Sequence, residues 1–326
     1  MASLIESLNY TSEQLNRYLA PIIFIVGVVG NILNCLVLSE RTLRSNPCAL
    51  LFLASSFIDL ISILIGLPTR ILAGWNLDPT TTIYWICKTR AFIVFSTRTM
   101  AIWLITLATI DRWLISSIDI HRRQMSNLKN VKREIFIIVT LSILTYTYML
   151  YCYEANIADA PLKCYGKSHT CRLITDLTYL FITIVIPLIL MILFGLLTIS
   201  HVHHSHSRIQ NEALGSVNIP STIKELHVKK VDHHLFRMLI IQVLLLTILC
   251  IPQTIEKFLI TFKSFGSESA LEDAIKVFLY NIEILLAFIA SSMSFYIYTL
   301  AGGSIFRKAF LGLIRTVKQK ITRQFH

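Results

Sequence analysis

The sequence predicts an all-α fold, a seven-transmembrane helix bundle with a short amphipathic eighth helix. Of its 326 residues, 54% are hydrophobic and only 15% are charged, whereas soluble domains usually carry about 25% charged residues. Seven apolar runs reach the roughly 20 residues that a helix needs to cross a bilayer. Lys and Arg residues gather in one alternating set of connections between these runs, as in multi-pass membrane proteins.

The seven apolar runs follow one another along almost the whole chain. They are roughly 19–40, 47–72, 86–117, 134–156, 175–201, 235–262 and 273–300. Five of them contain polar or charged residues, so we expect those helices to face one another as well as lipid. After the last run, residues 306–311 combine basic and apolar side chains, which predicts a short amphipathic helix with a basic and an apolar face on the membrane surface.

The longest break between the runs, 202–234, is rich in His, Ser and Lys. The stretch 201–206, which begins at the last residue of the fifth run, contains four histidines, a pattern that resembles a metal site. No carboxylate or cysteine completes a ligand set there. We therefore expect a solvated loop at the end of the fifth helix and no metal.

Three parts are expected: an extracellular N-terminus at 1–18, a seven-helix domain at 19–302, and an amphipathic helix with a cytoplasmic tail at 303–326. Of the 30 Lys and Arg residues, 18 fall on one side of the membrane, ten on the other and two inside the third run. The positive-inside rule then places the tail in the cytoplasm and residue 1 outside. The sequon that begins at Asn9 falls outside, where glycosylation occurs. The formal charge of +11 is explained by cytoplasmic loops, without nucleic-acid binding.

The third run carries an acidic–basic pair, Asp111 and Arg112, at one end and Cys87 at the other. A helix between Cys87 and Arg112 would be about 38 Å long, and the bilayer core is about 30 Å thick. The pair therefore lies at a water interface. Charges at the edge of lipid are costly unless they serve a function.

Seven helices, an outer N-terminus and the triad Asp111-Arg112-Trp113 resemble a rhodopsin-like (class A) G-protein-coupled receptor over residues 19–318. Further similar positions are Gly30, Asn31, Asp59, Cys87, Pro187, Pro252, Ser294 and Tyr298. The resemblance implies helix kinks at the two prolines. The seventh span and the tail are similar to invertebrate peptide receptors of the FMRFamide-receptor group.

Several positions depart from the family pattern. Trp113 replaces a tyrosine, and Cys250 stands where a switch tryptophan is usual. Phe295 replaces the seventh-helix proline, and Gly195 occupies a tyrosine position of the fifth helix. The fourth span lacks its usual tryptophan. We therefore expect the seven-helix architecture with an altered switching mechanism.

For the inner end, the resemblance implies a switch that couples to a G protein, built from Asp111, Arg112, Trp113, Asp232 and Tyr298. Asp232 precedes Pro252 by 20 residues, which places it about 30 Å away along one helix, at the inner face. An Arg112–Asp232 contact would then hold the closed state. The alternative is that Arg112 is an interfacial anchor that extends to lipid headgroups.

Asp59 falls near the middle of the membrane, where a charged carboxylate needs partners. We expect Asn31, Ser291 and Ser294 beside it. The family often binds a sodium ion at this place, although Ala101 stands where a serine ligand is common. A sodium site and a hydrogen-bonded structural acid remain open alternatives.

The resemblance also implies a disulfide between Cys87 and the second extracellular loop, in the oxidising secretory route. We expect Cys164 as the partner. Cys171 remains an alternative, although it lies close to the start of the fifth span. Cys35, Cys152 and Cys250 are expected to be buried packing residues.

A ligand pocket is expected between the outer halves of the helices. Its candidate residues are Arg70, Arg90, Val94, Arg98, Gln253, Glu256, Tyr280 and Glu283. Val94 stands where amine receptors carry an aspartate, which argues against a monoamine. Phe288 is the nearest match to the retinal-binding lysine of opsins, which argues against an opsin.

Arg98 lies well inside the membrane and must face the bundle. It is expected either to pair with Glu283 or another acid, or to contact a carboxylate or carbonyl of the ligand. Glu256 and Glu283 are suited to a basic residue of a peptide. The mixed charges favour a peptide over a lipid.

The sequence thus predicts a plasma-membrane receptor, activated by an extracellular peptide and coupled to a heterotrimeric G protein. Lipids are its other expected partners. No nucleophile–base pair, metal motif or phosphate loop indicates an enzyme. A transporter or channel is one alternative, because Asp59 and Arg98 could line a pathway, but it would not need the Asp111-Arg112 pair. A seven-helix protein that does not signal is another.

Overall fold

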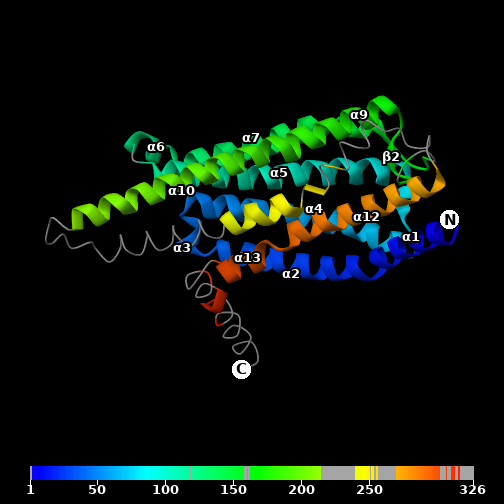
Figure 1. The fold of residues 1–326 in the computed structure, drawn as a ribbon, viewed down its shortest axis with the longest axis horizontal. Coiled ribbons are helices and arrows are strands. Elements are labelled where there is room, and N and C mark those ends of the chain that lie inside the picture. The colour runs from blue at the N-terminus through cyan, green and yellow to red at the C-terminus, as the bar shows by residue number, and fades with distance from the viewer. Residues whose placement is uncertain are drawn as a thin grey trace, which may run out of the picture.

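Long helices run side by side along the length of the molecule (Figure 1). The computed structural model describes residues 2–117, 119–157, 160, 162–213, 239–249, 251–252, 255, 269–301, 306, 310–312 and 315. Among these residues, six helices are long and apolar enough to cross a membrane, and a shorter apolar helix covers Leu239–Leu249. This arrangement confirms the predicted all-α, seven-helix bundle.

Most spans consist of more than one helical segment. The segments are α1 (Ala2–Gln14), η1 (Leu15–Leu19) and α2 (Ala20–Leu38); α4 (Pro47–Ala73); α5 (Tyr84–Ser116); α7 (Leu128–Tyr146) and α8 (Met149–Cys152); α9 (His169–Thr178), η3 (Tyr179–Val185) and α10 (Ile186–Ala213); and α12 (Ala270–Ser292) and α13 (Ser294–Ala301). Short helices lie between them: α3 (Arg41–Arg44), η2 (Pro79–Thr81) and α6 (Ile120–Met125). An antiparallel pair of strands, β1 (Tyr153–Glu154) and β2 (Tyr165–Gly166), follows the fourth span.

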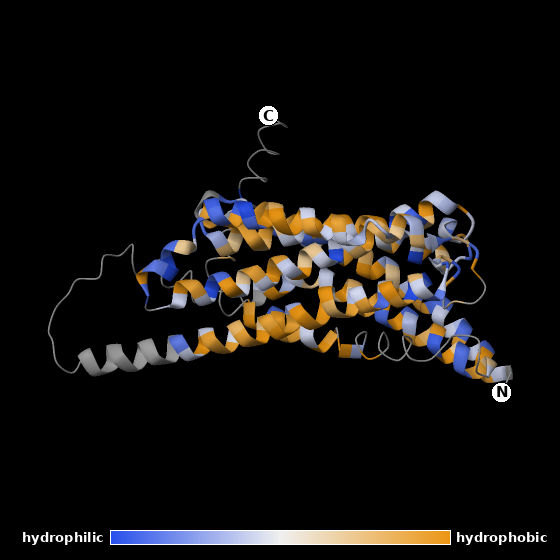
Figure 2. Ribbon diagram, turned by 90° about the horizontal axis from the view of Figure 1, so that it is seen from above, coloured by the Kyte–Doolittle hydropathy of each residue, from blue (hydrophilic) through white to orange (hydrophobic). Residues whose placement is uncertain are grey.

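The two ends of the bundle differ. One end carries α1, β2, α9 and the N-terminus, and we call it the disulfide end (Figure 1). The other end carries α3 and α6, and we call it the Arg112 end (Figure 1). Hydrophobic residues cover the middle of the helices, and hydrophilic ones gather towards both ends (Figure 2). Large apolar side chains such as Ile25, Leu64 and Leu196 are exposed there, so this surface is the one that lipid would cover.

Helix α5 lies at the centre of the bundle, with α4, α7 and α10 packed against it. Leu104 and Ala108 of α5 are fully buried. Close to the disulfide end, Gly66 of α4 permits a near approach of α12, because a Cβ atom there would meet Phe288 at 2.4 Å. The tight packing of α4, α5 and α12 fixes the walls of the pocket described below.

The proline in the fifth span coincides with a change of helix type. The π-helical turns of η3 end at Val185, and the N–H of Ile186 donates to the carbonyl of Phe181. Pro187 follows, and it has no N–H to donate. Wide turns of this kind bend helices, so the predicted irregularity at Pro187 is found as a π-helix. Pro252 is helical, but 250 and 253–254 beside it lie outside the described residues.

The chain is helical at two places where the sequence predicted no helix. Helix α1 begins at Ala2, well before the first apolar run, and Asn9 lies exposed on it. Helix α10 continues to Ala213, so the prediction of a solvated loop at 201–206 was wrong. Both segments extend existing spans, where a growing helix needs no new nucleation.

In the C-terminal region, the described residues Phe306, 310–312 and Arg315 are helical, as predicted for the eighth helix. The ring of Phe306 lies 6.2 Å from that of Tyr298, and the ring of Phe310 lies 5.6 Å from that of Phe295. The apolar face of this segment therefore packs against α13 at the foot of the last span.

Candidate functional site

Two disulfides tie down the connection between the fourth and fifth spans. Cys87 of α5 bonds to Cys164, which confirms the predicted pair and excludes the alternative with Cys171. Cys171 bonds instead to Cys152, so the prediction that Cys152 is a packing residue was wrong. The physical reason is that α8 ends at Cys152. The chain then turns into the β1–β2 hairpin, which places this thiol beside the first turn of α9.

The remaining cysteines make no other disulfide in the part of the chain that the structure describes. Cys48 is fully buried, and Cys35 is half-buried with a free thiol. Both lie on apolar helices, α2 and α4, and pack as small hydrophobic residues. Cys250 lies outside the described residues.

Beneath the β1–β2 hairpin, a pocket of about 570 Å³ opens between α4, α5, η3 and α12. Its lining residues are Arg70, Arg90, Ala91, Val94, Phe95, Arg98, Tyr153, Leu162, Cys164, Tyr179, Tyr280, Ile284 and Phe288. Five of the predicted pocket residues are therefore brought together, namely Arg70, Arg90, Val94, Arg98 and Tyr280. Glu283 is buried on α12 outside this lining. Gln253 and Glu256 lie outside the described residues.

Three arginines on two helices supply the charge of this pocket. A guanidinium nitrogen of Arg70, Nη1, donates to the side-chain oxygen of Asn281 at 3.3 Å. Nη2 of Arg90 donates to the carbonyl of Gly66, also at 3.3 Å. The Nε atoms of Arg70 and Arg90 have no hydrogen-bond partner in the described structure. Both side chains thus keep donor capacity at the pocket.

Arg98 is held from two sides. Its Nη1 donates to the hydroxyl of Tyr179 at 3.2 Å, and its guanidinium lies 5.1 Å from the centre of the Phe288 ring, close enough for a cation–π contact. One expectation was that Arg98 pairs with Glu283. The hydrogen bond that the structure shows goes to Tyr179 instead. Nη2 of Arg98 has no hydrogen-bond partner among the described residues.

Arg98 also lines a second cavity, of about 440 Å³, deeper in the bundle. This cavity contains Asp59, Ser291 and Ser294, three of the four residues predicted to lie together. Ser291 is within hydrogen-bonding range of the Asp59 carboxyl, and Asn31 donates to the Ser291 carbonyl at 3.1 Å. The predicted polar cluster is therefore formed.

The guanidinium of Arg98 competes with a sodium ion at this cluster, although Ser55, Ser291 and Ser294 supply side-chain oxygens beside Asp59. Sodium needs several oxygen ligands and a net negative surrounding. Here the guanidinium of Arg98 lines the same cavity as Asp59, and Ala101 supplies no side-chain oxygen. The arginine already provides the positive charge that a bound cation would bring. The charge of Arg98 therefore favours the hydrogen-bonded structural acid, one of the two open alternatives, over the sodium site.

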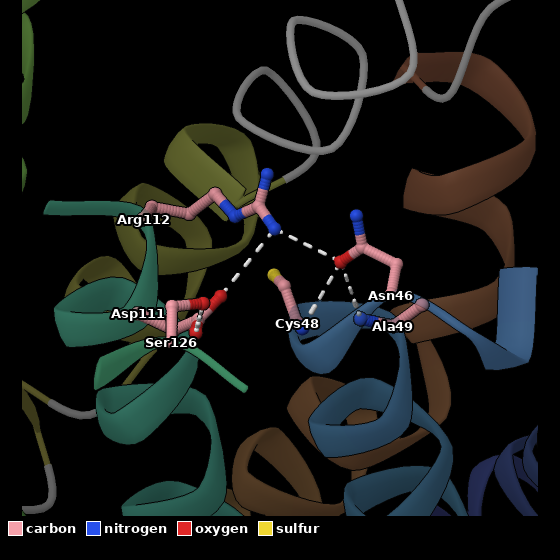
Figure 3. A network of polar contacts seen from close by, with 6 residues as sticks. All are labelled: Asn46, Cys48, Ala49, Asp111, Arg112 and Ser126. Atoms are coloured by element: carbon pink, nitrogen blue, oxygen red, sulfur yellow. Dashed lines mark hydrogen bonds and ion pairs between the residues drawn. The ribbon is translucent and has the colours of Figure 1, made fainter. Parts of the chain in front are cut away.

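At the Arg112 end, a polar network joins α5 to the beginning of α4 (Figure 3). Nη2 of Arg112 donates to Oδ1 of Asn46 at 2.9 Å and lies 3.4 Å from the carboxylate of Asp111. Ser126 donates to the other oxygen of Asp111. Arg112 is only 3% exposed, so it is not an anchor that extends to lipid headgroups. Asp232, its predicted partner, lies outside the described residues.

Asn46 has a second task in this network. Its Oδ1 accepts hydrogen bonds from the backbone N–H groups of Cys48 at 3.1 Å and Ala49 at 3.4 Å, which makes it the N-cap of α4. Asn followed by Pro47 is a known signal for a helix start. The sequence therefore contained a sign of this cap. No sequence pattern indicated that Arg112 also donates a hydrogen bond to Asn46. Asn46 was therefore not predicted as a site residue.

Trp113 and Tyr298 lie apart from the Arg112 network. The ring of Trp113 is 5.0 Å from that of Phe194 on α10, and the guanidinium of Arg122 lies 5.3 Å from its centre. The hydroxyl of Tyr298 donates to Gln242 on the Leu239–Leu249 helix. The two aromatic residues therefore connect α5 to the fifth span and α13 to the sixth.

The geometry of both ends agrees with what comparison with known proteins finds. A family model described as 7 transmembrane receptor (rhodopsin family) matches residues 30–298, most of the chain. The matched region includes the arginine-lined pocket, the Asp59 cluster and the Asp111-Arg112 pair. No curated protein matches the chain significantly.

Proposed function

Because the chain belongs to the rhodopsin family of seven-transmembrane receptors, we propose that it is a receptor for an extracellular peptide. Membership makes it a multi-pass plasma-membrane receptor that binds an extracellular ligand and signals through a heterotrimeric G protein. Receptors of this family are not enzymes. The peptide nature of the ligand is our inference from the pocket.

The observation that carries the peptide proposal is the lining of the pocket beneath the hairpin. It combines the three arginines Arg70, Arg90 and Arg98 with a wall of aromatic and aliphatic side chains. No acidic side chain lines it among the described residues, and Val94 stands where a monoamine would need a carboxylate. A side chain or a chain end of a peptide would enter this pocket between the arginines and the aromatic wall, and the remainder of the peptide would contact the hairpin and loops.

The proposal places the disulfide end outside the cell and the Arg112 end in the cytoplasm. Disulfides form in the oxidising secretory route, and both Cys87–Cys164 and Cys152–Cys171 lie near the pocket end. Asn9 is exposed on the helix that reaches the same end, which supports its glycosylation. The helical segment around Phe306 would then lie on the inner leaflet and contact its lipids.

In the proposed mechanism, the Arg112 network stabilises the resting state. Arg112 joins α5 to the N-terminus of α4 through Asn46, and the predicted contact to Asp232 on the sixth helix would add a second connection. A ligand that binds the active state more tightly shifts the populations of the two states. The network then opens and exposes a surface for the G protein.

The proposal is tested by G-protein activation in cells that express the full chain. A panel of peptides, each in amidated and free-acid form, includes ligands of the kind that the FMRFamide-receptor group binds. We expect at least one peptide to activate a G protein. If no peptide acts while the chain is shown to be at the cell surface, the peptide proposal fails, and the alternative of a protein that does not signal gains support.

A further inference from the structure

The pocket beneath the hairpin contains more donor capacity than its own walls satisfy. Arg70 and Arg98 are only 3% and 8% exposed. Nε of Arg70, Nε of Arg90 and Nη2 of Arg98 have no hydrogen-bond partner in the described structure. A buried cationic donor without an acceptor is costly. The pocket therefore favours a ligand that brings acceptors.

The acids that act on these arginines lie outside the pocket. Asp78 acts electrostatically on Arg70 and Arg90, but it caps η2 and does not line the pocket. Asp59, on which Arg98 acts electrostatically, lies in the deeper cavity. Among the described lining residues none is acidic. A negatively charged group inside the pocket would thus meet three cations and no described carboxylate.

The environment of Arg98 determines which anion fits best. Its Nη1 is fixed by Tyr179 at 3.2 Å, and the guanidinium carbon lies 5.1 Å from the centre of the Phe288 ring. A guanidinium whose orientation is already fixed loses little entropy when it binds a second partner. Its planar donors match the two oxygens of a carboxylate.

We propose that the pocket binds its ligand through a carboxylate, with Arg98 as the main contact and Arg70 and Arg90 beside it. Aromatic side chains of Phe95, Tyr153 and Phe288 line the same pocket, so an apolar or aromatic group fits next to the carboxylate. This inference deepens the proposed function and rests on it, because it assigns the anionic group to a peptide. The carboxylate belongs either to the C-terminus or to an acidic side chain.

The test uses three synthetic tetrapeptides as probes, with the purified full chain in lipid nanodiscs. They are N-acetyl-Ala-Ala-Ala-Phe with a free C-terminus, the same N-acetylated peptide amidated, and amidated N-acetyl-Asp-Ala-Ala-Phe. The readout is the concentration at which each probe raises the melting temperature. We expect a carboxylate-bearing probe to bind roughly tenfold to a hundredfold more tightly than the neutral amide, as for other hydrogen bonds to charged groups. The first and third probes distinguish the two sources of the carboxylate.

Two variants connect the preference to the proposed residue. Arg98→Gln keeps a donor for Tyr179 and removes the cation, so it should abolish the preference for a carboxylate. Lys88→Gln is the matched control, because Lys88 lies on the same helix, bonds to Tyr84 and does not line the pocket. Each variant's own melting temperature without peptide shows whether it is folded. A third variant, Arg98→Lys, keeps the positive charge but loses the planar pair of guanidinium donors. It should retain part of the preference for a carboxylate.

Three results would overturn the inference: equal binding of the neutral amide, a preference that survives in Arg98→Gln, or no effect of any probe. The proposed function fails separately. If amidated, uncharged peptides activate the receptor and Arg98→Gln, the peptide proposal stands and the carboxylate inference falls. If carboxylates bind through Arg98 while no peptide activates a G protein, the carboxylate inference stands and the peptide proposal falls.

Discussion

Replacing Asn46 is predicted to weaken the resting state of the receptor. Oδ1 of Asn46 is shared between the N-terminus of α4 and Nη2 of Arg112. Asn46→Ala removes both interactions at once. Asn46→Ser separates them, because a serine hydroxyl can still cap the helix but is too short to reach the guanidinium of Arg112.

The magnitudes follow from the two interactions. Loss of an N-cap costs about 1 kcal/mol of stability. Loss of a hydrogen bond to a buried charged group costs about 1.5–3 kcal/mol, and Arg112 is 3% exposed. If the second interaction exists only in the resting state, its loss raises the ratio of active to resting receptor roughly tenfold to 150-fold.

The assay is ligand-independent nucleotide exchange on a G protein, measured at equal surface expression. We expect Asn46→Ala and Asn46→Ser to raise this basal rate and to lower the melting temperature, Asn46→Ala by more because it also loses the cap of α4. Unchanged basal exchange in both variants would refute the reasoning. A rise in Asn46→Ala alone would assign the effect to the cap of α4 and remove Arg112 from the argument.

Three further predictions concern packing, the second disulfide and sodium. Gly66→Ala should destabilise the receptor by about 1–3 kcal/mol in thermal unfolding, because its Cβ would meet Phe288 at 2.4 Å, whereas Gly195→Ala, with nothing within 4 Å, should have little effect. Cys152→Ser should cost about 3 kcal/mol, as expected for a disulfide that spans 19 residues, and the loss should disappear under reducing conditions. Replacing sodium by potassium should leave the melting temperature of the unaltered chain unchanged, because Arg98 lines the cavity that the ion would occupy; a clear drop would contradict this.

Much of the fold could be predicted from the sequence, because apolar length and the placement of basic residues are local properties of the chain. The span predicted at 47–72 is found at Pro47–Ala73, and the one predicted at 86–117 at Tyr84–Ser116. The helix at Ala2–Gln14 was not predicted, because many of its residues are polar and they form no long apolar run. Its position depends on distant contacts with α12, and just after it, in η1, Asn16 donates a hydrogen bond to Asn281 of α12.

The candidate sites were predictable where a single helix fixes the position of a residue. Arg70, Arg90 and Arg98 each fall at a depth that the helical rise gives, and they line one pocket. The partners could not be predicted, because they come from other elements. Tyr179, which binds Arg98, is 81 residues away. Cys152 lies within an apolar run, and only the end of α8 shows that its thiol reaches Cys171.

The central claim is that an extracellular peptide activates this chain and that the Arg112 end transmits the signal to a G protein. The most direct measurement is nucleotide exchange on purified heterotrimeric G proteins by the full chain in nanodiscs, with and without each peptide of the panel. We predict that at least one peptide accelerates exchange and that Asn46→Ala raises the rate without peptide. The account would be contradicted if the chain is folded, as its melting temperature shows, and no peptide causes it to accelerate nucleotide exchange on any G protein.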